Sequence, residues 1–569
     1  MGGQWWDEGF CPPASTWATS NQQPSPFVEF ALATGRGGGY GQLIDVAMGA
    51  VIDKVGLPSF GLSVPPGKLH RDIHEGACPL FFVDQVGLEV IVEKSQPMII
   101  QGGMGAGVSD WRLANAVSRL GQLGVVSGAA LDQVFARRLQ LGDPGGHMRR
   151  GISYFPDQNI AQEILERYFR KEGLPEGKPF RAIPMFHAKS SRDHLNLNII
   201  ASFVEVALAK ERHDGVVGIN FLEKIPFPML SGLFGAILAG VDFVLVGAGI
   251  PGQIPNILDR LASWERVCLR IPLEGGKNDL VELMFDPSQH AARPDAPLRR
   301  PRFLPIVSSN VLAQSLLKRA TGNIDGFVFE HWTAGGHNAP PRGALRLSDS
   351  GEPIYGDRDV VDRGKLKDLG VPCWMAGGTG TPEALQQALA DGAAGVQVGT
   401  AFAFCRESGL DSKLRRDVID AVRSHSTGVF TDPVASPTGF PFKVVPVPGS
   451  VSEDDVYTAR ERTCDLGFLR HPYRRPDGTV GYRCPAEPVD DYVEKGGKAE
   501  DTEGRKCLCN ALMANIGMGQ ARPSRDAVEP PLVTAGTDVA HLERYLLEGA
   551  DEYSAADVIN YLLTGVMQV

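Results

Sequence analysis

One pattern repeats along this chain and constrains its fold more than any other feature. A short apolar run ends in glycine or another small residue, an amphipathic stretch follows, and then the next apolar run begins. The runs occupy residues 97–105, 123–129, 216–222, 241–249, 302–310, 324–332, 371–380 and 394–402. Apolar strands that alternate with helices are typical of parallel strands covered by helices. Eight such units predict an α/β protein with a closed (β/α)₈ barrel, the TIM barrel, and an open doubly wound sheet is the competing architecture.

The segments between the runs have helical periodicity, as at residues 110–123, 228–240, 310–321 and 381–391. The last of these begins with Thr381, Pro382 and Glu383, which is an N-cap residue followed by proline at the first helical position. We therefore expect this helix to start directly after a glycine-rich loop.

The repeat covers only part of the 569 residues, so the rest is assigned to extensions and insertions. We predict an N-terminal extension over 1–95, a barrel over 96–430 and a C-terminal extension over 431–569 that packs on the barrel. The barrel is interrupted by insertions at about 130–215 and 252–301. The first insertion has two helical segments around an expected extra strand at 180–186. The second ends in a polar loop, and an amphipathic helix near 555–563 closes the chain.

Composition limits the partners and the compartment. The net charge is −11 with no Lys/Arg cluster, which argues against nucleic acid and anionic membranes as partners. The most apolar long stretch, 232–252, contains Asp242 and divides into helix plus strand, so we expect no membrane span. No leader peptide is expected, and nine scattered cysteines favour a reducing cytoplasm over a disulfide framework.

Glycines gather where a barrel would bind a ligand. Gly377, Gly378 and Gly380 precede a helix, and Gly399 with Thr400 follows the last apolar run. In this fold the loops after the last two strands are the usual phosphate site, since backbone N–H groups and helix N-termini attract anions. Tight turns that require positive φ are the alternative explanation of these glycines.

A histidine follows another glycine pair at a predicted strand end, in the sequence Ala334-Gly335-Gly336-His337. Imidazole titrates near neutral pH and can accept a proton from a weakly acidic carbon. His337 is therefore the candidate catalytic residue, although a loop histidine bonded to backbone groups has the same appearance in sequence.

These residues carry a resemblance to a known family. The segments "PMIIQGGMG", "VVGINFL", "FEHWTAGGHN" and "WMAGGTGTPEALQQALADGAAGVQVGTAF" resemble the nitronate monooxygenases, formerly 2-nitropropane dioxygenases, over about residues 96–405. That family consists of FMN-dependent TIM barrels, and flavin-dependent enoyl-acyl-carrier-protein reductases share its scaffold. Two segments depart from the family pattern. Thr333 stands where the family has Glu, and Asn338-Ala339-Pro340-Pro341 follows the histidine, so the rim of the site differs.

The resemblance implies roles for individual residues. His337 would be the base beside the flavin. The residues implied in FMN binding are Gly103, Met104 and Gly105 against the ring, Asn220 and the close-passing Gly335 and Gly336, and Gly377, Gly378, Gly399 and Thr400 at the phosphate.

The implied activity is an FMN-dependent oxidation of a nitroalkane or nitronate-like small molecule by O₂. The alternative is a flavin-dependent reductase that uses NAD(P)H to reduce an activated enone or acyl thioester, and a non-enzymatic flavin-binding subunit is a third possibility. The sequence leaves homodimerisation open.

Four cysteines in the predicted C-terminal extension allow two interpretations. Cys464, Cys484, Cys507 and Cys509 lie within 46 residues, so four thiolates could bind Zn²⁺ or an iron–sulfur cluster. The paired spacing typical of such sites is absent, and buried free cysteines behave as small apolar side chains. We therefore assign no metal ligands from sequence, and we treat His70 and His74 as structural.

Overall fold

Eight parallel strands form the centre of the protein, and each lies within one of the predicted apolar runs. The computed structural model describes residues 96–275 and 279–566, all within one compact unit, Val92–Val569. The strands are β1 (Ile99–Gln101), β2 (Gly124–Ser127), β3 (Val217–Leu222), β4 (Phe243–Gly247), β7 (Arg302–Val307), β8 (Phe327–Glu330), β9 (Cys373–Ala376) and β10 (Gly395–Val398). The predicted N-terminal extension, with His70 and His74, lies outside the described residues.

The sheet closes on itself. Its strand order is β1-β10-β9-β8-β7-β4-β3-β2, and every neighbouring pair is parallel. The two ends of that order meet at a parallel bridge between Ile100 and Leu123. There the Gln101 N–H donates to the Leu123 carbonyl at 2.9 Å, and the Leu123 N–H donates to the Ile99 carbonyl at 3.1 Å. The prediction of a closed (β/α)₈ barrel is confirmed, and the open doubly wound sheet is wrong.

Successive side chains of a strand point alternately into the barrel and toward the surrounding helices. In β4, Phe243 and Leu245 belong to one buried cluster, whereas Val244 and Val246 belong to another that includes helical residues. The inner cluster comprises Ile100, Leu123, Val125, Phe243, Leu245, Leu304, Val328, Trp374 and Ala376. Large apolar side chains fill the interior of small barrels in this way, so the ligand site must lie at an end of the barrel.

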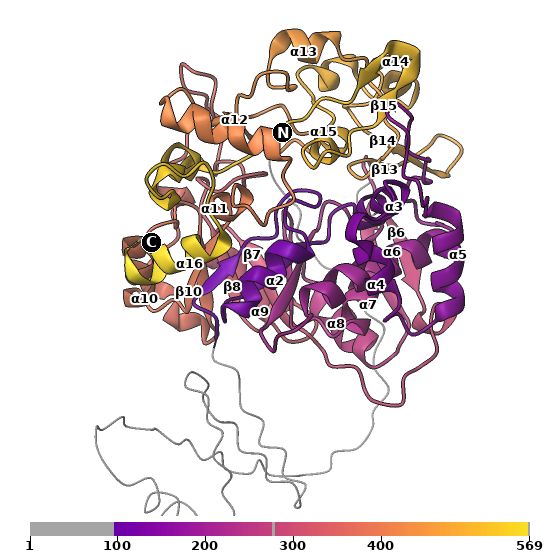
Figure 1. Cartoon of the computed structure of the whole chain (residues 1–569), viewed down its shortest axis with the longest axis horizontal. Coiled ribbons are helices and arrows are strands. Elements are labelled where there is room, and N and C mark those ends of the chain that lie inside the picture. The colour runs from indigo at the N-terminus through magenta and orange to yellow at the C-terminus, as the bar shows by residue number, and fades with distance from the viewer. Residues whose placement is uncertain (1–95, 276–278, 567–569) are drawn as a thin grey trace, which may run out of the picture. The chain divides into compact units, whose positions relative to one another are not determined.

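Helices surround the strands, as Figure 1 shows. Those that follow barrel strands outside the first insertion are α2 (Trp111–Arg119), α7 (Met229–Leu238), α8 (Ile254–Ala262), α9 (Asn310–Arg319), α10 (Pro382–Ala390) and α11 (Thr400–Ala403), after which comes α12 (Ser412–Arg423). Local sequence sets their starts. The side chains of Asp110, Ser309 and Thr381 accept N–H groups of the first turns of α2, α9 and α10, and Pro382 is the first residue of α10, as predicted.

The first insertion is helical but has no strand. It contains α3 (Leu131–Gln140), α4 (His147–Ile152), α5 (Gln158–Tyr168) and the long, largely buried α6 (Arg192–Ala209). The expected strand at 180–186 is wrong, because side chains instead of a neighbouring strand bond its backbone. Gln520 bonds both the N–H and the carbonyl of Phe180, and the Gln140 side chain accepts the Arg181 N–H.

The second insertion contains a hairpin that the sequence analysis did not anticipate. After α8, β5 (Val267–Pro272) and β6 (Leu280–Phe285) pair antiparallel, and the predicted polar loop follows. Alternate side chains of β5, such as Val267, Leu269 and Ile271, are buried. This period-two pattern is the signal of a half-buried strand.

The residues after 430 form short elements that pack on the barrel. They are β11 (Phe430–Asp432), β12 (Phe442–Val444), α13 (Asp454–Ala459), β13 (His471–Arg474), β14 (Val480–Arg483), α14 (Val489–Glu494), α15 (Leu508–Ala514), β15 (Ala521–Arg522), β16 (Ala527–Val528) and the predicted closing helix α16 (Ala555–Thr564). Figure 1 shows α13, α14 and α15 at the top of the view, beyond the strands.

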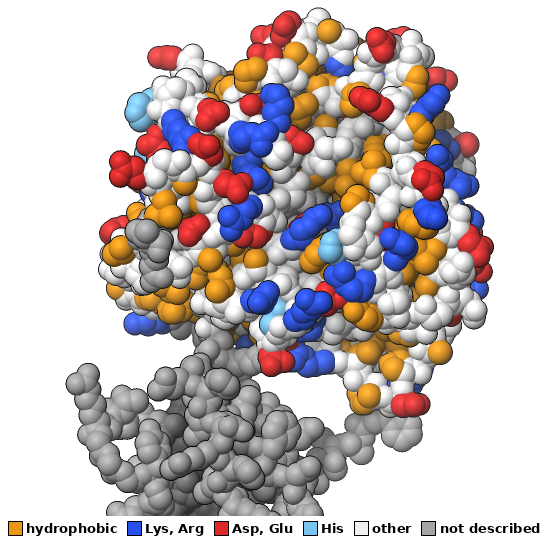
Figure 2. Space-filling view, viewed as in Figure 1, with side chains coloured by type: hydrophobic (Ala, Val, Ile, Leu, Met, Phe, Trp, Pro, Cys, Tyr) orange, Lys and Arg blue, Asp and Glu red, His pale blue; other side chains and the backbone are white. Residues whose placement is uncertain are grey.

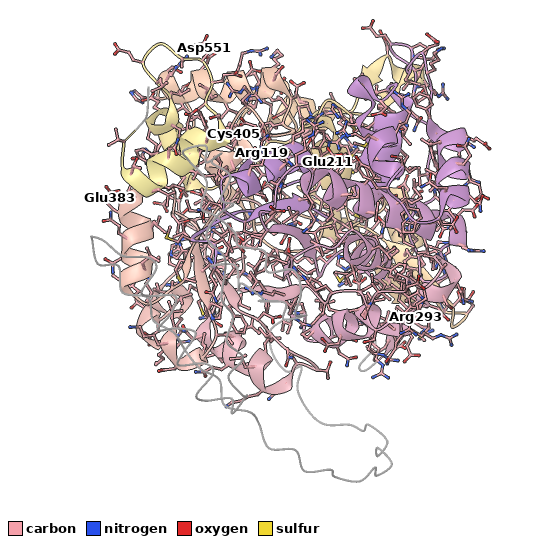
Figure 3. All side chains as sticks on the ribbon, turned by 60° about the horizontal axis from the view of Figure 1, so that its bottom comes forward. Arg119, Glu211, Arg293, Glu383, Cys405 and Asp551 are labelled. Carbon is pink, nitrogen blue, oxygen red and sulfur yellow. The ribbon has the colours of Figure 1, made fainter. Side chains whose placement is uncertain are left out.

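The end of the chain returns to the barrel. Cys405, labelled in Figure 3, lies beside this yellow C-terminal segment and is fully buried. The Tyr553 hydroxyl donates to the Ala401 carbonyl at 2.7 Å, and the Arg406 N–H donates to the Tyr553 carbonyl at 2.8 Å. The C-terminal segment therefore covers the turn that follows the last strand.

The surface is mixed in charge. Figure 2 shows acidic and basic side chains interspersed with apolar ones over the visible face. Within the described part of the chain, no helix combines the length and the apolar character that crossing a bilayer requires.

Candidate active site

The carboxyl ends of the barrel strands open into a cavity of about 250 Å³. Every residue that the sequence analysis assigned to the flavin or to catalysis lines it. These are Gly103, Met104, Gly105, Asn220, Gly335, Gly336, His337, Gly377, Gly378, Gly399 and Thr400. They come from the ends of β1, β3, β8, β9 and β10, so closure of the barrel brings distant segments into one site.

The loop after β1 approaches β3 closely. A Cβ at Gly103 would lie 2.4 Å from the Asn220 Cβ, so only glycine fits there. The Asn220 side chain donates to the Gly103 carbonyl at 3.2 Å, and the Ser109 hydroxyl accepts the Met104 N–H at 2.9 Å. These contacts fix Met104 on the cavity wall.

The end of β9 provides exposed backbone donors. Gly377 and Gly378 have φ values of +91° and +70°, a conformation that side chains other than glycine rarely adopt. Among the described residues, the N–H groups of Gly377, Gly378 and Gly399 have no hydrogen-bond partner. Such free amides at a cavity wall suit an anionic group.

Two groups next to these free amides already have hydrogen-bond partners. The Asp538 carboxylate accepts the Gly380 N–H at 3.3 Å, and the Thr400 hydroxyl accepts the Gly536 N–H at 2.9 Å. Both partners come from the C-terminal extension (residues 431–569). An anion would therefore bind at the amides of Gly377, Gly378 and Gly399. Thr400 instead bonds the backbone of the C-terminal extension.

Three buried polar atoms on the cavity wall have no hydrogen-bond partner among the described residues. They are Asn220 Oδ1, Gln397 Oε1 and Lys224 Nζ. Buried polar groups are almost always hydrogen-bonded, so these atoms are suited to a polar ligand. The wall beside them is apolar, with side chains of Met104, Leu222, Ile306, Phe404, Phe442, Phe468, Leu469 and Val533. A flat heteroaromatic ring with polar edges and a phosphate matches this set, and the residues fit a flavin.

His337 lies in the cavity and is held by the C-terminal extension. Its Nε2 is 2.7 Å from the Ser436 hydroxyl, which is 2.8 Å from the Thr438 hydroxyl. The Phe442 ring packs edge-on against the imidazole, with centroids 4.9 Å apart. Burial, together with Lys224, lowers the pKa of His337 to about 3, so the imidazole is neutral at physiological pH.

The glycine pair before His337 has two separate structural reasons. A Cβ at Gly335 would lie 2.8 Å from the Ala535 carbonyl carbon and the Gly536 nitrogen. Gly336 has φ of +78°, and its N–H donates to the Thr534 hydroxyl at 2.9 Å. Gly335 therefore makes room for the C-terminal extension, and Gly336 turns the backbone.

The two departures from the family pattern also bond locally. Thr333 Oγ1 is 2.8 Å from His331 Nδ1, and the Asn338 N–H donates to the Pro441 carbonyl at 2.9 Å. The residues after the histidine thus join the barrel loop to the C-terminal extension.

The sequence analysis missed two titratable residues of the cavity, Lys224 and Glu330. Burial lowers the pKa of Lys224 to about 7, against the opposing charges of Glu223 and Glu330. Burial raises the pKa of Glu330 to about 7, against the opposing charge of Lys224. Lys224 Nζ lies 3.0 Å from the Phe440 ring centroid. Their positions directly after β3 and at the end of β8 are the signal that could have identified them.

The nitronate monooxygenase family model matches residues 302–429. No curated protein sequence matches the chain. Among solved structures, FabK from Thermotoga maritima has 16% identity over 82% of this chain and 92% of that one, with a TM-score of 0.41.

Two further structures are similar over comparable lengths. Nitroalkane oxidase from Streptomyces ansochromogenes has 16% identity over 82% of this chain and 95% of that one, with a TM-score of 0.38. The enoyl reductase domain of MlnA from Bacillus amyloliquefaciens has 9% identity, with coverages of 82% and 93% and a TM-score of 0.41.

The family match confirms the predicted resemblance across the last barrel units, which carry His337 and the glycine cradle. It confirms that the protein is an enzyme of the flavin-dependent oxidoreductase class.

Proposed function

We propose that the protein is an FMN-dependent oxidoreductase that oxidises a nitroalkane or its nitronate with O₂. The observation that carries this proposal is the set of unpartnered groups in the cavity. Free amides at Gly377, Gly378 and Gly399 suit a phosphate. The buried Lys224 ammonium group has no hydrogen-bond partner among the described residues and suits a small anion nearby.

FMN would be held by the residues described above. The glycine amides would bind its phosphate, and Asn220 and Gln397 would accept hydrogen bonds from its ring. FMN, when bound, supplies the electron transfer that no side chain of the cavity can perform. FMN is favoured over FAD because the described residues place one group of free glycine amides at the cavity, which suits a single phosphate.

The substrate anion would pair with Lys224. A nitronate carries its negative charge on two oxygens, and the protonated Lys224 amine faces the cavity without a counter-ion bonded to it among the described residues. A buried cation attracts an anion more strongly than a solvated one, because water screens the charge less there. Lys224 would therefore orient the substrate against the ring.

His337 would take the proton from a neutral nitroalkane. A buried imidazole holds an added proton poorly, as its lowered pKa indicates. The hydroxyls of Ser436 and Thr438 offer a path. One ring nitrogen can accept a proton while Nε2 gives one to Ser436, which passes its own to the half-buried Thr438 and so to solvent. The imidazole would then transfer the proton without storing the charge.

One observation also fits a second function, that of a flavin-dependent reductase. A neutral His337 is also suited to donate a hydrogen bond to a carbonyl, as an NAD(P)H-dependent enoyl or acyl-thioester reductase would need. In that reaction the substrate enters uncharged, so Lys224 would not pair with it.

Anaerobic reduction of the purified holoprotein distinguishes the two. A nitronate, added without O₂, should bleach the flavin absorbance, and admitting O₂ should restore it. Bleaching by NADPH and not by the nitronate would contradict the oxidase and favour the reductase. The released cofactor, identified by mass spectrometry, should be FMN. Finding FAD, or no flavin after incubation with FMN, would refute the cofactor assignment.

A further inference from the structure

The Phe440 ring of the C-terminal extension lies directly against the Lys224 ammonium group. Lys224 Nζ is 3.0 Å from the centroid of that ring. Lys224 lines the candidate flavin cavity, whereas the described residues that line this cavity do not include Phe440. The ring therefore contacts the ammonium group from outside the cavity and leaves the side that faces the cavity open to a ligand.

The ring is the closest group that can stabilise the charge of Lys224. Lys224 Nζ is buried and has no hydrogen-bond partner among the described residues. Burial lowers its pKa to about 7, against the charges of Glu223 and Glu330. Two histidines also face Lys224: burial, and then its charge, lower the pKa of His337, and burial chiefly lowers that of His471. The negative face of an aromatic ring attracts an ammonium group, and the attraction is stronger where water is excluded.

The backbone on both sides of Phe440 is fixed by the fold. Before the ring, the Gly439 N–H donates to the Ser436 carbonyl at 3.2 Å, and Gly439 has a φ of +76°, so the chain turns there. After the ring, the Pro441 carbonyl accepts the Asn338 N–H at 2.9 Å. A residue that precedes proline is also restricted to extended conformations. The segment therefore holds the ring in place, and the longer lysine side chain lies against it.

We propose that Phe440 is a positioning residue that keeps the Lys224 ammonium group charged and directed at a ligand in the cavity. The use of this contact rests on the proposed function, in which Lys224 binds the anionic substrate. An aliphatic side chain at position 440 would cover the stem of the lysine equally well. The face of the ring is therefore the property to test.

The first test compares position-440 side chains of similar bulk in the whole chain, purified with its flavin. Trace acetylation by acetic anhydride at a series of pH values, read by mass spectrometry of the Lys224 peptide, measures the pKa of this amine. The exposed Lys413 is the internal reference. Phe440→Leu should lower the charged fraction of Lys224 at pH 8 by about tenfold. Replacement of Phe440 by 3,4,5-trifluorophenylalanine keeps the ring, makes its face less negative, and should also lower that fraction.

The second test measures anion binding to the same proteins by isothermal titration calorimetry. Nitrate is a suitable probe because, like a nitronate, it is planar and shares its charge over oxygens bound to nitrogen. At pH 8, Phe440→Leu should bind nitrate about tenfold more weakly, since the lysine charge then limits binding. At pH 5.5, where Lys224 is mostly charged in both proteins, the loss should be less than about twofold. An equal loss at both pH values would reduce Phe440 to a packing role.

The outcomes separate this inference from the proposed function. If the pKa of Lys224 is unchanged in both altered proteins, the ring does not support the charge and the inference is wrong. If that pKa falls, but the protein neither binds nitrate nor is bleached by a nitronate, the proposed function fails while the contact with Phe440 stands. If Phe440→Leu does not fold, the fluorinated protein decides, because its ring is nearly unchanged in size.

Discussion

The candidate active site has two walls of different origin. The barrel contributes backbone amides at Gly377, Gly378 and Gly399 and the side chains of Asn220 and His337, all at strand ends. The C-terminal extension contributes apolar side chains such as Phe442, Phe468 and Val533, with few groups that could react. The barrel wall therefore carries most of the groups that could bind or react with a ligand, and the extension wall encloses the cavity.

The contacts between the two walls show what the extension adds. Ser436 bonds His337, Thr534 bonds Gly336, and Gly536 bonds Thr400, each across the boundary. Each bond fixes a loop that follows a barrel strand. A site whose reacting groups are held by surrounding residues is preorganised, which is worth more than the individual hydrogen bonds. The proposed catalytic residue His337 therefore comes from the barrel, and the hydrogen bonds that hold its loop come from the extension.

The largest effect should come from charge placed on the barrel wall. Gly378→Asp puts a carboxylate beside the proposed phosphate site, and like charges in a partly dry site repel strongly. Asp tolerates positive φ better than most residues, so the fold should survive. FMN should be absent from the purified variant. Gly378→Asn, of equal shape without the charge, is the control and should retain more FMN. Wild-type FMN content in Gly378→Asp would show that the phosphate lies elsewhere.

His337→Ala should leave FMN bound but lower turnover of a neutral nitroalkane by roughly 10²–10⁴-fold, the usual worth of a positioned base. A preformed nitronate should lose much less, because its proton is already gone. On the extension side, Ser436→Ala removes one hydrogen bond and should cost about tenfold, equivalent to about 1.4 kcal/mol. Steady-state kinetics with both substrate forms measure this. If His337→Ala lowers turnover of the nitroalkane and of the nitronate equally, His337 is not the base.

Gly335→Ala tests the fit between the walls. A Cβ there would meet the Ala535–Gly536 backbone at 2.8 Å, so the extension must shift. Overpacking of this kind should lower the free energy of unfolding by about 1–3 kcal/mol. Gly428→Ala is a matched control, since nothing lies within 4 Å of a Cβ there. Denaturant unfolding compares the two. A Gly335→Ala protein as stable as the control would mean that the extension is not held at this point.

The smallest expected effect is a pH dependence of the KM for a nitronate, caused by the titration of Lys224. Its folded pKa is lowered to about 7, so its positive charge is lost as the pH rises through that value. The KM for a nitronate should therefore rise, by up to about tenfold, as the pH rises through 7. Lys224→Met should show a high KM that no longer changes with pH in this range. Lys413→Met, at an exposed position on α12, should behave as wild type.

Glu330→Gln tests the direction in which the pH-dependent change in KM moves. The Glu330 carboxylate raises the pKa of Lys224, so its removal should move the change in KM to a lower pH. A change that moves to a higher pH, or that persists in Lys224→Met, would assign the titration to another group.

The sequence by itself indicated eight parallel strands covered by helices, favoured a closed barrel over an open sheet, and placed the barrel wall of the site. Eight apolar runs can bury their backbones only as parallel strands covered by helices, and glycines at their ends are read directly from the chain. His337 and the cradle residues followed from their places after those runs. The hairpin of β5 and β6 was missed in spite of its period-two pattern, and the expected strand at 180–186 failed because Gln140 and Gln520 bond its backbone.

Only the tertiary structure decided the rest. The contacts of Ser436 with His337 and of Ala535 with Gly335 join residues about 100 to 200 positions apart, and no local pattern encodes such pairs. The lowered pKa of His337 also depends on burial, which is a property of packing and not of residue type. Likewise, the spacing of Cys464, Cys484, Cys507 and Cys509 matches no paired motif, and their shared cavity exists because the loops around β13, β14 and α15 fold against one another.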